Sequence, residues 1–106
     1  MTGQLSALTD ALLRVSDRYA ELFDIRRDDD WFILKLQEEQ GELTAEVLRA
    51  TGRGRLKGAS GDDVRTALED ETADVLAMLL LFARHNGVDL DAALQRKWLS
   101  YLPPQG

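Results

Sequence analysis

Hydrophobic residues along this chain recur at spacings of three and four, which is the period of an amphipathic α-helix. The first series predicts a helix over residues 4–24, and its members are Leu5, Leu8, Leu12, Val15, Tyr19 and Leu22. A second helix is expected over residues 30–50, preceded by the acidic run Asp28 to Asp30, with one apolar side made of Phe32, Ile33, Leu36, Leu43 and Val47. Each of the two helices therefore has one side suited to a core and one suited to solvent.

A glycine-rich basic segment, TGRGRLKGASG at 51–61, interrupts this pattern and is expected to form a loop. After it, Ser60 with Asp63, or Asp62 itself, offers an N-cap for a third helix that continues to His85. Asn86-Gly87 supplies a helix stop. A fourth helix is expected from near Asp89 to before the two prolines at 103–104. No strand-like alternation or internal repeat competes, so the sequence predicts an all-α fold of four helices.

The third predicted helix contains a segment, residues 75–83, that is apolar on every side. A surface helix of a small monomer needs a polar face, so we expect a homo-oligomer that completes a helical bundle. A homodimer is the simplest assembly and a homotetramer is the next. The alternative is that the other three helices already cover this segment within the monomer.

Size and charge narrow the function classes. The chain has 106 residues, enough for one modest core, and we expect a single domain over 1–106. Its formal charge of −6 disfavours nucleic acid as a partner, because a phosphate backbone is attracted by clustered cations. The absence of cysteine excludes thiolate chemistry and zinc fingers. The N-terminus resembles no signal peptide and the longest apolar run is too short to span a bilayer, so no membrane partner and a cytoplasmic location are expected.

Four acids of the second helix, Glu38, Glu39, Glu42 and Glu46, fall within an arc of about 100° on one helix face. Like charges three or four residues apart destabilise a helix by about 0.2–0.5 kcal/mol per pair. A bound divalent cation would reverse the sign of this effect. A solvated charged surface is the alternative interpretation.

Glu71 makes a cation more credible, because it lies within an apolar stripe of the third helix. The stripe consists of Val64, Leu68, Val75, Met78 and Phe82. A bare carboxylate in a core costs several kcal/mol unless it is protonated, paired or bound to a metal. Asp74 lies one turn further on and flanks the same position.

The two acidic segments, LQEEQGEL at 36–43 and ETADVL at 71–76, together resemble the MazG-like all-α nucleotide pyrophosphohydrolases. The ExxE half corresponds to Glu39 and Glu42, with Glu38 preceding it, and the ExxD half corresponds to Glu71 and Asp74. The resemblance covers about residues 29–98 and includes HNGVDLDAALQRKW at 85–98. Either half alone is common on helices, whereas the two in this order and spacing are much more specific.

The resemblance implies that a nucleoside triphosphate is hydrolysed between its α and β phosphates to a monophosphate and pyrophosphate. It also implies Mg²⁺ as cofactor, with Mn²⁺ as a substitute, and oxygen-only ligands suit both ions. The expected ligands are Glu39, Glu42, Glu71 and Asp74. Glu38 is the candidate to orient or deprotonate the attacking water. Glu46 is a weaker candidate, with a solvent-facing acid as its alternative.

Phosphates also need cationic contacts. The candidates are Arg53, Arg55 and Lys57 in the loop and Arg96 and Lys97 in the fourth helix. Lys97 is the first choice because it matches a lysine that members of the resembled family often carry in their final helix. Many of them place asparagine four residues later, where this chain has Tyr101. Trp31 is a candidate to stack on the base, with ordinary packing as its alternative.

Three functions remain open at this point. The main hypothesis is a magnesium-dependent nucleoside triphosphate pyrophosphohydrolase, in the role of a house-cleaning enzyme that removes unwanted nucleotides. The alternatives are a phosphoribosyl-ATP pyrophosphohydrolase and a noncatalytic metal-binding helical interaction module. The single histidine, His85, lies at a helix end and is expected to interact with the helix dipole rather than with a metal.

Overall fold

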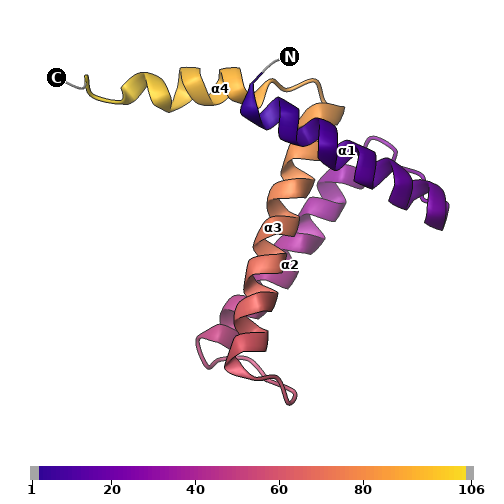
Figure 1. Cartoon of the computed structure of the whole chain (residues 1–106), viewed down its shortest axis with the longest axis vertical. Helices are drawn as coiled ribbons and strands as arrows, with labels where there is room; N and C mark the ends of the chain where they lie inside the picture. The colour runs from indigo at the N-terminus through magenta and orange to yellow at the C-terminus, as the bar shows by residue number, and fades with distance from the viewer. Residues whose placement is uncertain (1–2, 105–106) are drawn as a thin grey trace. The chain divides into compact units, whose positions relative to one another are not determined.

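A computed structural model describes residues 3–104, and over this range the chain forms four α-helices and no strand (Figure 1). The elements are α1 (Gln4–Phe23), α2 (Trp31–Ala50), α3 (Gly61–His85), α4 (Leu90–Lys97) and a short 3₁₀ helix η1 (Leu99–Tyr101). The all-α prediction is therefore confirmed, and α1, α2 and α3 begin and end within a few residues of the predicted positions.

The predicted start signals are found at the helix ends. Ser60 and Asp63 bond reciprocally at the start of α3: the Ser60 amide donates to Asp63 Oδ2 at 3.0 Å, and the Asp63 amide donates to Ser60 Oγ at 3.1 Å. Asp89 is the N-cap of α4, where its Oδ1 accepts from the Ala92 amide at 3.1 Å. These bonds satisfy amides that a helix leaves without intrahelical partners.

The fourth helix is shorter than predicted. We expected it to continue to the prolines, but α4 ends at Lys97 and the chain continues as η1. Trp98 has left the α-helical conformation, with φ −121° and ψ −56°. The apolar residues that follow, Leu99, Tyr101 and Leu102, are all exposed, so no buried helix face extends α4 further.

The described residues fall into two compact units, and α3 contributes to both. The terminal unit takes its residues from Met1–Arg26 and Leu80–Gly106. In it, Asp91 of α4 caps α1, because its carboxylate accepts from the amides of Leu5 (3.3 Å) and Ser6 (3.1 Å). Arg84 of α3 donates to the Ser6 carbonyl at 3.0 Å and pairs with Asp10 at 2.8 Å. These bonds attach α1 to both α3 and α4.

The hairpin unit, Arg27–Leu79, consists of α2, the glycine-rich loop and most of α3. The two helices run side by side (Figure 1). Asp28 Oδ1 accepts from the Trp31 amide at 3.0 Å and so marks the start of α2. Phe32 and Val64 are the buried apolar residues of this unit. The Trp31 ring contacts the Phe32 ring edge-on, with the ring centroids 5.0 Å apart. Such a contact is expected if Trp31 has a packing role.

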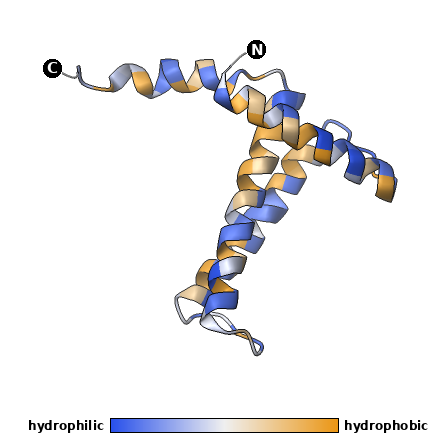
Figure 2. Cartoon of the chain, viewed as in Figure 1, coloured by the Kyte–Doolittle hydropathy of each residue, from blue (hydrophilic) through white to orange (hydrophobic). Residues whose placement is uncertain are grey.

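Many large apolar side chains remain exposed on the chain as described. Those on α1 include Leu8, Val15, Tyr19, Leu22 and Phe23, which make up much of the predicted apolar series. Leu76 and Leu79 of α3 are also exposed. They belong to the apolar C-terminal half of that helix, which is orange in Figure 2. Within residues 3–104, no helix has both the length and the apolar character that a bilayer span requires.

Candidate metal centre

Three carboxylates of the hairpin unit converge. Glu39 and Glu42 come from α2 and Glu71 comes from α3, and one oxygen of each lies within 4.8 Å of the others. Glu39 and Glu42 are three residues apart on one helix and so share a face, while the pairing of α2 with α3 brings Glu71 to that face. The structure thus joins the two motif halves that the sequence separates by about thirty residues.

The burial of these carboxylates is unequal. Glu39 is only 9% exposed, Glu71 is half-buried and Glu42 is exposed, so the cluster opens on the Glu42 side. Glu39 Oε2 and Glu71 Oε2 are sealed from solvent and have no hydrogen-bond partner among the described residues. Leaving a buried polar atom unpaired costs about 1–3 kcal/mol, and more when the group is charged. Because two such oxygens lie in the same cluster, we expect the site to bind a cation or to hold protons.

The raised pKa values within the cluster also indicate a site for a cation or for protons. Burial raises the pKa of Glu39 to about 7, with further contributions from a hydrogen bond with Glu42 and from the charges of Glu42, Asp74 and Glu71. Burial likewise raises the pKa of Glu71, followed by the charges of Glu42 and Asp74. A divalent cation among the carboxylates would favour their ionised forms, because opposite charge stabilises the carboxylate. An all-oxygen set of acidic ligands fits a hard ion such as Mg²⁺.

The remaining predicted acids lie around this cluster. Asp74 is exposed and is not one of the three converging carboxylates, but its charge raises the pKa of both Glu39 and Glu71. Glu38 points to solvent, with 55% of its side chain exposed, and pairs with Lys35 at 3.0 Å. This hydrogen bond is the main reason that the pKa of Lys35 is raised.

Glu46 does not face solvent, which was the alternative left open for it by the sequence. Its side chain is only 15% exposed, and both of its oxygens accept from Arg49 Nη1 at 2.9 Å. Arg49 was not among the sequence candidates. It follows Glu46 by three residues on the same face, and that spacing was the signal available to find it.

The candidate phosphate contacts lie in different places. Arg55 and Lys57 line an open hollow of about 570 Å³ in the hairpin unit, whereas Arg53 donates through Nε to Thr51 Oγ1 at 3.0 Å. Arg96 and Lys97 are exposed in the last turn of α4, within the terminal unit. The assignment of these five cations to substrate phosphates stays a prediction, and so does the assignment of Trp31 to the base.

No family model matches this chain, and no curated protein and no solved structure matches it significantly. The two motifs and the convergence of their carboxylates are therefore the features that indicate its function.

Proposed function

We propose that this protein is a magnesium-dependent nucleotide pyrophosphohydrolase. One observation carries the proposal: a nine-tenths buried carboxylate, Glu39, has an unpartnered oxygen and lies against Glu42 of its own helix and Glu71 of the next. The order and spacing of the acidic motifs resemble those of the MazG-like enzymes, and this resemblance supplies the reaction class. Water and a nucleoside triphosphate are the reactants, and a nucleoside monophosphate and pyrophosphate are the products.

Glu39, Glu42 and Glu71 would hold the cation, and Asp74 would add a fourth carboxylate. When bound, Mg²⁺ would supply neutralisation of the phosphate charge and activation of water. The exposed side of Glu42 leaves the cluster open to a ligand, while the burial of Glu39 limits the access of bulk water to its inner side. The protein thereby concentrates negative charge at one position, where a nucleotide that carries Mg²⁺ on its phosphates would bind better than the free nucleotide anion.

We propose that Glu38 accepts the proton of the attacking water. It precedes the ligand Glu39, lies on the solvent side of the site and is oriented by Lys35. An exposed carboxylate beside the cluster can accept a proton from the attacking water and release it to solvent. Arg55 and Lys57 of the hairpin unit are the proposed contacts to substrate phosphates.

We also propose that the active protein is a homodimer or homotetramer. The exposed apolar residues of α1, and separately those of α3, support this, because large exposed apolar side chains are characteristic of association sites. A bundle of helices from two or more copies would bury them.

Product analysis tests the function. The purified protein is incubated with canonical and modified nucleoside triphosphates and with phosphoribosyl-ATP, with and without Mg²⁺, and the products are separated by ion-exchange chromatography. Magnesium-dependent formation of a monophosphate and pyrophosphate from triphosphates supports the proposal. Selective turnover of phosphoribosyl-ATP would favour that narrower activity. No turnover by folded, magnesium-bound protein would favour a noncatalytic metal-binding module.

A further inference from the structure

The hollow beside the glycine-rich loop is a second site to consider in the hairpin unit. It has a volume of about 570 Å³, within the range of small-molecule sites, and its polar lining includes Glu46, Arg49, Arg55 and Lys57. The loop segment 51–61 carries three basic residues and no acid, in a chain whose net charge is −6. This is therefore a locally basic surface on an acidic protein.

Two of these cations are free to bind a ligand. Within residues 3–104, neither Arg55 nor Lys57 forms an ion pair or a side-chain hydrogen bond. The charge of Arg49, in contrast, is used internally by Glu46. The positive potential of the hollow thus comes from Arg55 and Lys57, which are residue types that bind phosphate oxygens.

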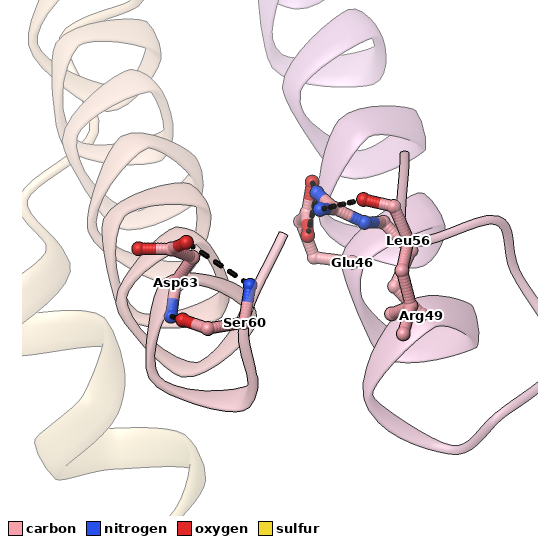
Figure 3. A network of polar contacts seen from close by, with 5 residues as sticks. All are labelled: Glu46, Arg49, Leu56, Ser60 and Asp63. Atoms are coloured by element: carbon pink, nitrogen blue, oxygen red, sulfur yellow. Dashed lines mark hydrogen bonds and ion pairs between the residues drawn. The ribbon is translucent and has the colours of Figure 1, made fainter. Parts of the chain in front are cut away.

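Arg49 holds the loop in place (Figure 3). While Glu46 fixes one arm of its guanidinium, Nη2 donates to the Leu56 carbonyl, between Arg55 and Lys57, at 3.2 Å. The loop backbone also comes close: a Cβ added to Gly54 would lie 3.0 Å from Arg49 Cγ. The Arg53 amide donates to the Leu48 carbonyl at 2.7 Å, which anchors the start of the loop. These contacts therefore hold the loop backbone that carries Arg55 and Lys57.

Lys57 adopts a conformation that a side chain rarely takes. Its φ is +53°, in the left-handed region where glycine is most at ease. Such strained positions cluster at functional sites, where the side chain is needed despite the backbone cost. A lysine at this position of the loop wall is consistent with a ligand contact.

The hollow also lies next to the candidate metal centre along α2. Glu39, Glu42, Glu46 and Arg49 follow one another at spacings of three, four and three residues on one helix face. Glu46, which lines the hollow, is about 6 Å along the axis from Glu42 at the usual rise of a helix. A cation site and an anion site on consecutive turns suit the two ends of a charged phosphate chain.

We propose that this hollow is a phosphate-binding subsite, with Arg55 and Lys57 as its contacts and the Glu46–Arg49 pair as its positioning residues. The ligand is a polyphosphate group, either the far end of a substrate's phosphate chain or a separate phosphate compound. Its role in turnover rests on the proposed function, but binding of a phosphate chain does not.

The binding test uses inorganic tripolyphosphate in EDTA, so that no metal bridges the protein and the anion. Saturable shifts of the amide NMR signals of residues 52–59 are expected on titration. We expect Arg55→Ala and Lys57→Ala each to weaken binding about tenfold, since each removes a charge-assisted contact. Arg65→Ala is the charge-matched control: Arg65 is exposed on α3 of the same unit and does not line the hollow, and we expect less than a threefold change.

Two further variants separate binding from folding. Lys57→Gly relieves the backbone strain, so its thermal midpoint should equal or exceed that of the wild type while tripolyphosphate binding falls. Arg49→Lys keeps the charge but loses the guanidinium fork, so amides of the loop should exchange hydrogen faster and binding should weaken. Absence of binding by the wild type, or equal losses in Arg65→Ala and Lys57→Ala, would overturn the proposal.

Competition identifies the source of the phosphate. If tripolyphosphate inhibits nucleotide turnover competitively and Lys57→Ala raises KM without changing kcat, the subsite takes the substrate's phosphate chain. Noncompetitive inhibition assigns it to a separate phosphate compound. If the protein turns over no nucleotide, the proposed function fails, whereas the EDTA titration still decides whether the subsite exists.

Discussion

Replacement of Glu39 by glutamine should stabilise the metal-free protein and abolish its stabilisation by Mg²⁺. Burial and neighbouring acids raise the pKa of Glu39 from 4.5 to about 7, so the folded state holds a proton more tightly than the unfolded state. The stability linked to this proton is fully present below pH 4.5 and is lost as the pH rises through 7. The shift corresponds to about 3 kcal/mol.

At pH 8 the wild type carries an ionised, buried Glu39 at that cost, whereas glutamine is neutral. We therefore expect Glu39→Gln to raise the free energy of unfolding by about 2–3 kcal/mol at pH 8 in EDTA, or about 10 °C in Tm. At pH 4.5 the two proteins should differ little, because Glu39 is then protonated in the folded state and about half protonated in the unfolded state. Thermal unfolding followed by circular dichroism at both pH values measures this difference.

Mg²⁺ should stabilise the wild type but not the Glu39→Gln protein. At a concentration of a hundred times Kd it should stabilise the wild type by about 2.7 kcal/mol at pH 8, and it should leave Glu39→Gln almost unchanged. Glu69→Gln, an exposed substitution on α3 outside the cluster, is the matched control and should behave as the wild type. A Glu39→Gln protein that is less stable than the wild type at pH 8 in EDTA would refute the reasoning.

Further predictions concern the cluster and the terminal unit. Glu71→Gln should remove magnesium-dependent turnover and keep the helical circular dichroism spectrum; full activity with normal magnesium dependence would reject its role as a ligand. Asp91→Ala should lower stability by about 1 kcal/mol, because two amides of α1 lose their acceptor, whereas Asp91→Asn should keep most of it; equal Tm values for the three proteins would contradict the capping role. Gly3→Ala should also lower Tm, since its φ is +123° and an added Cβ would lie 2.5 Å from Asp91 Cγ.

The fold was largely predictable because local signals agree with one another. The apolar spacings give the helices, and Ser60, Asp63 and Asp89 mark two of their starts by bonds that the structure contains. The Glu39, Glu42 and Glu71 cluster was predictable for a different reason. Each motif half places its acids on one helix face, and only the pairing of α2 with α3 was needed to join them.

Features that depend on tertiary contact were not predictable. Periodicity continues α4 past Lys97, but the exposed apolar residues there give the helix nothing to pack against. Glu46 has the sequence pattern of a solvent-facing acid, and its burial beside Arg49 follows from the way the loop returns to α2. Asp91 caps a helix 85 residues away in sequence, which no local pattern indicates.

The convergence of three carboxylates as a cation site is the central claim, and a crystal grown with saturating Mn²⁺ tests it most directly. Mn²⁺ takes the same oxygen ligands as Mg²⁺ and is located by its anomalous scattering. We predict an anomalous peak bonded to oxygens of Glu39, Glu42 and Glu71, including at least one of the two sealed oxygens. Mn²⁺ bound only elsewhere, with the three carboxylates bonded to one another instead, would contradict the claim.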